Sequence, residues 1–119
     1  IGDLISRTDV LLFGIGTAMR MADQRHIADD VRKLLVDNLA VGEALGQYCD
    51  IEGKLINSTN NIGLSLPDVV KVPNVIAVAG GQEKASAIIG VMRACQKVIL
   101  IIDEQAAEGM RQLLQISAL

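Results

Sequence analysis

The sequence predicts a mixed α/β fold with a parallel sheet, and two patterns support that prediction. Three short apolar runs, at residues 10–13, 75–79 and 98–102, are bounded by polar residues or glycine and are too short for helices. Unbroken runs of this length are typical of strands buried on both faces, as in a parallel sheet covered by helices. Segments with helical spacing follow each run, and this alternation indicates a parallel, right-handed arrangement.

Length and composition limit the class of protein. With 119 residues, 50% of them hydrophobic and 21% charged, the chain has the size and composition of one globular domain or part of one. It begins with Ile1 and Gly2 instead of methionine, so we expect it to be part of a longer protein. Its longest apolar runs fall far short of the ~20 residues that cross a bilayer. We therefore expect no membrane contact and a cytoplasmic location.

Several kinds of partner and site are disfavoured by composition. A net charge of −3, with one Tyr and one Phe, argues against nucleic-acid binding by this segment, which would need a basic stripe or aromatic stacking platforms. Cys49 and Cys95 lack the spacing of a disulfide or metal framework, and we expect both to be buried thiols in a reducing cytosol. No metal or cofactor is expected.

The first strand leads into the stretch on which the functional prediction rests. It ends at Gly14-Ile15-Gly16-Thr17, and Thr17 is a plausible N-cap for a helix that follows. Glycine lets the backbone turn sharply and lets a ligand approach closely. A glycine turn before a helix N-terminus favours anion binding, so we interpret it as half of a phosphate pocket. The alternative is a tight turn without a ligand.

The remaining elements are expected in the following order. Residues 18–36 read as two helical pieces, with Asp29 and Asp30 in the first turn of the second. Residues 40–57 predict a β-hairpin folded over the sheet, with a turn at residues 50–53 and a short strand at Leu55–Ile56. A polar loop at 57–65, a short helix containing Pro67, and helices after the second and third strands complete the chain. The last helix has its apolar stripe at Ala106, Met110, Leu113 and Leu114.

Parallel sheets bind ligands beyond the carboxyl ends of their strands, and Lys84 follows the second of these ends. A cation in the first turn of a helix is unfavourable unless an anion offsets it, which favours a phosphorylated ligand there. The alternative is that Lys84 projects into solvent. The Gly-x-Gly-x-x-Gly fingerprint of dinucleotide-binding proteins is not complete, because Met19 stands where its third glycine belongs. The phosphate-binding loop of nucleoside-triphosphate-binding proteins is not present either, because no Gly-Lys-Ser/Thr occurs.

Support for catalysis is thin. His26, the single histidine, is expected to be structural or exposed, and no spacing of a nucleophile and a base is legible. Asp103 and Glu104 are candidates for a general base or, more commonly at this position, for a helix cap. Glu43 stands among apolar residues, so it is either exposed or turned into a pocket, where its carboxylate would accept hydrogen bonds from sugar hydroxyls. We expect no catalytic residue.

Taken together, several motifs resemble the effector-binding domain of SorC-type bacterial transcriptional regulators over almost the whole chain. The shared stretches are Phe13-Gly-Ile-Gly-Thr-Ala18, Ala40-Val-Gly-Glu43 through Gly46, Asp50 with Gly53, Ile76-Ala-Val-Ala-Gly-Gly81 with Lys84-Ala85, and Asp103-Glu104. The resemblance implies a Rossmann-like, three-layer α/β fold, as in phosphosugar isomerases and glucosamine-phosphate deaminases. Residues 1–119 would be the C-terminal part of that domain. It also implies a phosphosugar effector, such as fructose 1,6-bisphosphate.

Carried over by motif, the resemblance implies ligand contacts at Gly14, Gly16, Thr17, Glu43 and Lys84. It further implies an arginine contact after the glycine loop, at a place where either Gln24 or Arg25 faces the ligand.

Such regulators carry an N-terminal helix-turn-helix domain, which is not in this sequence, and we expect a homo-oligomer, dimer or tetramer. The sequence thus predicts an effector sensor that acts on DNA only through another domain. The alternatives are a phosphosugar isomerase or deaminase on the same fold and a purely structural or dimerisation domain.

Overall fold

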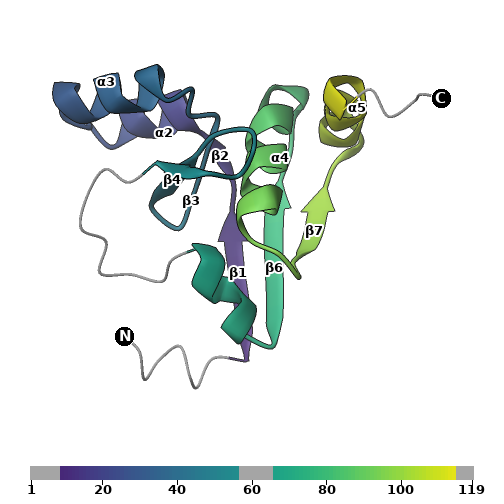
Figure 1. Ribbon diagram of the computed structural model, residues 1–119. Coiled ribbons are helices and arrows are strands. Elements are labelled where there is room, and N and C mark those ends of the chain that lie inside the picture. The colour runs from purple at the N-terminus through teal and green to yellow at the C-terminus, as the bar shows by residue number, and fades with distance from the viewer. Residues whose placement is uncertain (1–8, 57–65, 115–119) are drawn as a thin grey trace.

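A computed structural model describes residues 9–56 and 66–114 as a mixed α/β fold with two sheets (Figure 1). The larger sheet is parallel and contains β1 (Val10–Gly14), β6 (Asn74–Ala79) and β7 (Ile99–Ile102), in the order β1-β6-β7. These strands coincide with the three apolar runs, so the prediction of a parallel α/β fold is confirmed.

Helices cover only one face of the parallel sheet among the described residues. A 3₁₀ turn, η2 (Gln82–Lys84), leads from β6 into α4 (Ala85–Ala94), and α5 (Glu104–Leu114) follows β7 (Figure 1). The core lies between α4 and the sheet, where Phe13, Ala77, Ile88 and Val91 are buried. The described residues therefore supply two of the three layers that the sequence led us to expect.

The smaller sheet is antiparallel and contains β2 (Gly16–Thr17), β3 (Gly42–Ala44), β4 (Gln47–Cys49) and β5 (Leu55–Ile56). The predicted hairpin is present, together with a second turn that the sequence did not reveal. β3 and β4 meet at Leu45 and Gly46, both with positive φ, as in the tight turns that suit a hairpin. At the predicted turn, the Asp50 side chain accepts hydrogen bonds from the N–H groups of Glu52 and Lys54.

Glycines let the smaller sheet approach α4 closely. A Cβ added at Gly42 would lie 2.9 Å from the carbonyl oxygen of Ala87 in α4. One added at Gly90, also in α4, would lie 2.5 Å from the carbonyl oxygen of Asp50. The hairpin therefore packs against α4, and hairpin, α4 and parallel sheet contribute to one buried cluster.

The two helical pieces predicted after the glycine loop are α2 (Ala18–Gln24) and α3 (Asp29–Asp37), with Asp29 and Asp30 in the first turn of α3 as expected. They pack on the smaller sheet through a second apolar cluster that contains Ala18, Ala22, Leu35 and Tyr48. The short helix around Pro67 is the 3₁₀ helix η1 (Leu66–Lys71). The predicted polar loop at 57–65 lies outside the described residues.

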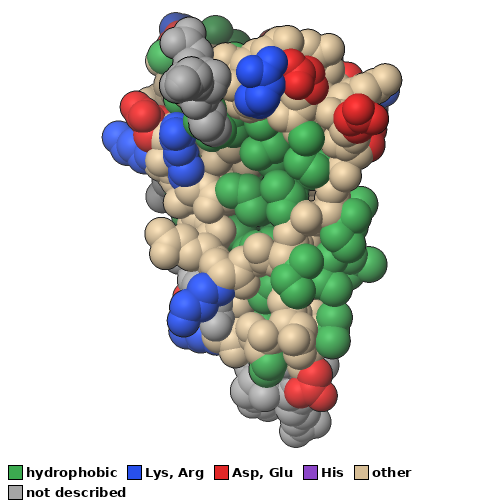
Figure 2. Space-filling view, turned by 90° about the vertical axis from the view of Figure 1, so that its right-hand side faces the viewer, with side chains coloured by type: hydrophobic (Ala, Val, Ile, Leu, Met, Phe, Trp, Pro, Cys, Tyr) green, Lys and Arg blue, Asp and Glu red, His purple; other side chains and the backbone are tan. Residues whose placement is uncertain are grey.

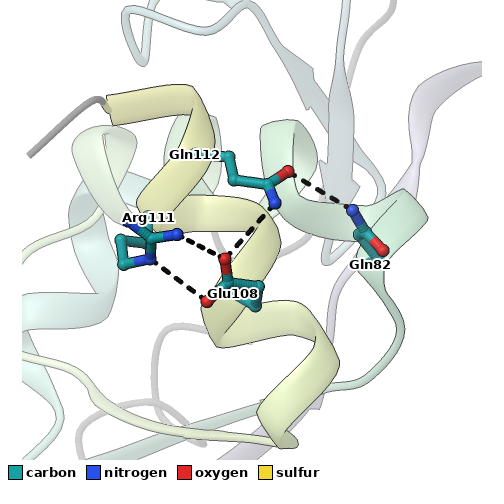
Figure 3. A network of polar contacts seen from close by, with 4 residues as sticks. All are labelled: Gln82, Glu108, Arg111 and Gln112. Carbon is teal, nitrogen blue, oxygen red and sulfur yellow. Dashed lines mark hydrogen bonds and ion pairs between the residues drawn. The ribbon is translucent and has the colours of Figure 1, made fainter. Parts of the chain in front are cut away.

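Helix α5 docks on the junction of η2 and α4. Gly109 permits this approach, since an added Cβ would lie 2.9 Å from the Cβ of Ala85. Figure 3 shows the polar contacts at the surface: Gln82 of η2 donates to Gln112 at 3.5 Å, and Gln112 donates to Glu108 at 3.3 Å. The contact between Gln82 and Gln112 links α5 to η2, the turn that ends at Lys84.

The apolar stripe predicted for the last helix is only partly buried. Ala106 is buried, but Leu113 and Leu114 are 54% and 38% exposed. Cys49 and Cys95 are free, buried thiols, as predicted, and burial raises their pKa values to about 12 and about 11. Within the described ranges, no helix is long and apolar enough to span a bilayer.

Candidate functional site

A cavity of about 430 Å³ opens at the carboxyl ends of β1 and β6. Its lining brings together five of the seven residues for which the sequence predicts a ligand contact: Gly14, Gly16, Arg25, Glu43 and Lys84. They come from the end of β1, the start of β2, the residue after α2, the hairpin strand β3 and the end of η2. Segments far apart in the sequence thus converge where a parallel sheet is expected to bind a ligand.

Glu43 is the buried acid of this cavity. It lies opposite Gly16 in the β2–β3 pairing, and only 3% of its surface is exposed. Its carboxylate accepts a hydrogen bond from the Gly46 N–H at 2.8 Å and pairs with the Arg25 guanidinium at 2.7 Å. Of the two environments that the sequence left open for Glu43, the structure shows the pocket.

Arg25, and not Gln24, reaches the cavity. Arg25 follows the last residue of α2, and its side chain is 44% exposed beside Glu43. Gln24 is exposed and does not line the cavity. One nitrogen of the guanidinium is paired with Glu43, which leaves the other N–H donors available to an anion in the cavity.

Lys84 supplies the second positive charge. It ends η2 and stands at the N-cap position of α4, at the positive end of a ten-residue helix. Within residues 9–56 and 66–114, no acidic side chain forms an ion pair with it. Lys84 therefore places a positive charge at the N-terminus of a helix, as the sequence indicated, and no carboxylate in this part of the chain pairs with it.

Asp103 holds the turn from which Lys84 projects. Both of its carboxylate oxygens lie 3.1 Å from the Gly81 N–H, and one accepts from the Ala106 N–H at 2.8 Å. These backbone hydrogen bonds lower the pKa of Asp103. It caps α5 and does not line the cavity, so the structure shows the capping role that was the commoner expectation.

The glycine loop donates fewer backbone groups to a ligand than the sequence suggested. The N–H of Ile15 is bonded to the Val78 carbonyl, and the N–H of Ala18 to the Val41 carbonyl. Thr17 stands at the N-cap of α2, as predicted, but its side chain makes no capping hydrogen bond and does not line the cavity. The charged side chains, more than the loop amides, are therefore the groups available to contact an anion in the cavity.

The apolar part of the wall was not predicted. It consists of Phe13, Ile15, Met21, Leu45 and Val78. Such side chains carry no chemical signal in a sequence, since the same residues fill ordinary cores. They make one side of the cavity suitable for the carbon skeleton of a ligand.

Tyr48 lies opposite Glu43 in the β3–β4 pairing, so the two side chains share one face of the smaller sheet. It is 3% exposed, and its hydroxyl has no hydrogen-bond partner among the described residues. Burial, followed by the charge of Glu43, raises the pKa of the phenol, and the nearby Arg25 opposes that rise without forming a hydrogen bond of good geometry. Tyr48 packs behind the site as a neutral group.

Other chemistry is not supported by the described part of the chain. His26 is exposed, one of the two environments that the sequence predicted for it, and it does not line the cavity. Among the described residues, no group of three or more His, Cys, Asp or Glu side chains has the geometry of a metal site.

Comparison with known proteins places this site in a family. A family model described as "Putative sugar-binding domain" matches residues 1–112. The chain belongs to this sugar-binding domain family. The domain is 36% identical over 104 residues to the central glycolytic genes regulator of Bacillus subtilis (strain 168), and 38% identical over 105 residues to that of Priestia megaterium. These matches cover 87% and 88% of the domain but only 31% of each regulator.

A solved structure agrees with the sequence relatives. The sugar-binding domain matches the crystal structure of a "putative SorC family transcriptional regulator" from Enterococcus faecalis with a TM-score of 0.84 at 38% identity. The match covers 91% of this chain and 44% of that one. The resemblance to SorC-type regulators is thereby confirmed, and the chain spans less than half of the related structure.

Proposed function

We propose that this sugar-binding domain is the effector-sensing part of a bacterial transcriptional regulator and that its cavity binds a phosphorylated sugar. The observation that carries the proposal is the arrangement of Arg25 and Lys84, two cations, with the buried carboxylate of Glu43 around one cavity at the carboxyl ends of the strands. A volume of about 430 Å³ lies within the range of small-molecule sites. The relatives named as regulators support the same interpretation.

Each group has a definite role in this proposal. The ammonium of Lys84 and the free N–H donors of Arg25 bind a phosphate, and Glu43 accepts hydrogen bonds from sugar hydroxyls. A Cβ added at Gly14 would make only an ordinary van der Waals contact, with the Val78 carbonyl oxygen 3.8 Å away, so the backbone there is not crowded. With two positive charges and one negative charge in the wall, the cavity favours an anionic sugar over a neutral one.

Fructose 1,6-bisphosphate is our first candidate for the effector. Glycolytic regulators are among the relatives, and two cations in the wall suit a ligand that carries several negative charges. Thr17, which lies next to the glycine loop but outside the cavity lining, would complete the site if its side chain turned toward a bound phosphate.

We propose a sensor and not an isomerase or deaminase, because these reactions need a positioned general base. The one acid that lines the cavity among the described residues is Glu43, and no histidine lines the cavity beside it to relay a proton. One oxygen of its carboxylate contacts Arg25 and the Gly46 N–H, which leaves the other to accept from a sugar hydroxyl. Asp103 accepts two backbone N–H groups at another position.

We further propose that residues 1–119 are the C-terminal part of the effector domain in a cytoplasmic homo-oligomer. DNA would then be contacted through a helix-turn-helix domain outside this segment.

Thermal unfolding of the full-length protein tests the proposed function. The panel comprises fructose 1,6-bisphosphate, fructose 6-phosphate, glucose 6-phosphate and unphosphorylated fructose. A ligand at ~100 times its Kd stabilises by roughly 2.7 kcal/mol, which is readily visible as a rise in Tm. We expect the bisphosphate to raise Tm, fructose to have no effect, and no product to form on incubation. Product formation would indicate an enzyme, and no response to any phosphorylated sugar would overturn the proposal.

Two lysine variants test whether phosphosugars bind in the cavity. Lys84→Ala is expected to weaken phosphosugar binding without lowering the Tm of the unliganded protein, because it removes a charge that pairs with no acid among the described residues. Lys71→Ala is the control, since Lys71 is exposed in η1 at the other end of β6. Equal affinity in both variants would remove Lys84 from the site.

A further inference from the structure

The hydroxyl of Tyr48 is the one fully buried side-chain polar atom that has no hydrogen-bond partner among the described residues. Tyr48 is only 3% exposed, so solvent does not satisfy the hydroxyl from outside. A buried hydroxyl without a partner is costly and uncommon in folded proteins, and each one calls for an explanation. Phenylalanine would supply the same ring without that cost.

The architecture of the fold does not explain this hydroxyl. Exposed hydrophobic side chains are gathered over the middle and right of Figure 2, and the fold class already accounts for uncovered apolar surface on the parallel sheet. Tyr48 belongs instead to the smaller sheet, in an apolar cluster with Ala18, Ala22 and Leu35 from α2 and α3. Its surroundings are therefore already packed, and the reason for a hydroxyl there has to come from a neighbouring polar group.

Glu43 is the first such neighbour. It pairs directly with Tyr48 across β3 and β4, which places the two Cβ atoms about 4.5–5.5 Å apart on one face of the sheet. Each of the two residues is only 3% exposed. Burial first, and then the charge of Glu43, raises the pKa of the phenol, so the hydroxyl stays protonated and can donate to a carboxylate.

Arg25 is the second neighbour, and it now serves the carboxylate. Its guanidinium lies 2.7 Å from the oxygen of Glu43 that also accepts from the Gly46 N–H. The same guanidinium is close enough to Tyr48 to oppose the rise in the pKa of the phenol. Of the three side chains, Arg25 alone is partly exposed, at 44%, so it is the one that can turn toward a ligand in the cavity.

A phosphate bound by Arg25 changes what Glu43 requires. The guanidinium would then share its charge between the phosphate and the carboxylate, and its hold on Glu43 would weaken. A buried carboxylate that loses its cation is costly unless another donor replaces it. The phenol of Tyr48 is a donor within the same buried group, and O–H···O⁻ hydrogen bonds are among the stronger ones in proteins.

We propose that Tyr48 is a positioning residue of the effector site: when Arg25 turns toward the phosphate of a bound sugar, the Tyr48 hydroxyl donates a hydrogen bond to the Glu43 carboxylate. This inference rests on the proposed function. The carboxylate then has a strong donor in both arrangements, Arg25 in the first and Tyr48 in the second. Glu43 thus keeps its place in the cavity wall, where it accepts from the sugar hydroxyls.

Tyr48→Phe in the full-length protein tests the proposal through two measurements with different expected results. Without ligand, the variant loses a hydroxyl that has no partner, so its Tm should equal or exceed that of the wild type. Calorimetric titration with fructose 1,6-bisphosphate should give a Kd about tenfold higher than the wild-type value, because a hydrogen bond to a charged group is lost only in the complex. A residue that only packs would leave Kd unchanged.

Glu43→Gln tests whether the hydroxyl acts through the carboxylate. This substitution removes the charge that Tyr48 would serve but keeps an acceptor for the Gly46 N–H. In the Glu43→Gln background, Tyr48→Phe should change Kd by no more than about twofold, the scatter expected for independent changes. The same loss of affinity in both backgrounds would mean that Tyr48 does not act on Glu43, and would overturn the proposal.

The remaining outcomes separate this inference from the proposed function. An unchanged Kd in Tyr48→Phe, beside a wild type that binds the bisphosphate, would overturn the inference and leave the proposed function intact. A lower Tm without ligand, or a failure to fold, would also overturn it, because the hydroxyl would then already form a stabilising hydrogen bond. A wild-type protein that binds no phosphorylated sugar would refute the proposed function itself, and the inference would fail with it.

Discussion

The ion pair between Arg25 and Glu43 allows the sharpest test of the site's energetics. Surface ion pairs contribute about 0–1 kcal/mol, whereas removal of one partner from a buried pair costs about 3–5 kcal/mol. Here Glu43 is buried and Arg25 is 44% exposed, so we expect a value between these limits. Arg25→Met should lower the free energy of unfolding by about 2 kcal/mol, because the carboxylate then keeps only the hydrogen bond from Gly46.

A double-mutant cycle separates the pair from the side chains themselves. Glu43→Gln keeps an acceptor for the Gly46 N–H but removes the charge, and the double variant removes the pair without leaving a buried charge. Urea unfolding at pH 7 gives each free energy. We expect a coupling energy of at least ~1 kcal/mol, well above the ~0.5 kcal/mol scatter of independent sites.

The control for this cycle is Arg20→Met, which removes an exposed arginine from α2 that forms no ion pair with the described residues. It should change stability by less than ~0.5 kcal/mol. Additive effects of Arg25→Met and Glu43→Gln would refute the reasoning, since they would mean that the contact at 2.7 Å does not stabilise the fold.

Two further predictions concern the framework around the cavity. Gly42→Ala should destabilise the protein by about 1–3 kcal/mol, because the new Cβ would lie 2.9 Å from the backbone oxygen of Ala87 and a backbone atom cannot turn aside; an unchanged Tm would contradict this. Asp103 has a lowered pKa in the folded state, so its hydrogen bonds to Gly81 and Ala106 stabilise above its ordinary value of 3.8 and are lost as the pH falls through the lowered value. The deficit of Asp103→Asn in urea midpoint should therefore shrink as the pH falls from 5 to 2, and a deficit independent of pH would contradict it.

The elements set by local pattern were predictable from the sequence. The three parallel strands and the helices α3, α4 and α5 could each be predicted from the spacing of apolar residues within the segment itself. The turn between β3 and β4 was missed, because Leu45 adopts a positive φ that leucine disfavours. Leu45 is partly buried against the main core cluster, and a local pattern does not reveal such a tertiary contact.

The site residues, too, were partly predictable from the sequence and partly not. Gly14, Gly16, Glu43 and Lys84 stand at strand ends or in a motif, so their positions in the sequence already indicated a shared edge. The choice between Gln24 and Arg25 depends on the direction of the chain at the end of α2. Neighbouring residues of a helix point about 100° apart, so only one of the two can face the cavity. The α2–α3 connection, with His26 at a φ of 52°, sets that direction.

The cavity is placed where a bound anion would connect two separate parts of the fold. Arg25 belongs to α2 and the smaller sheet, whereas Lys84 belongs to α4 and the parallel sheet. Arg25 is held by Glu43, and Lys84 has no paired acid among the described residues, so only one of the two cations is neutralised. In the proposed function, a phosphorylated ligand would neutralise Lys84 and contact both parts at once. Because a ligand shifts an equilibrium only by its difference in affinity between two states, the proposed sensing requires a second state in which the separation of Arg25 and Lys84 differs.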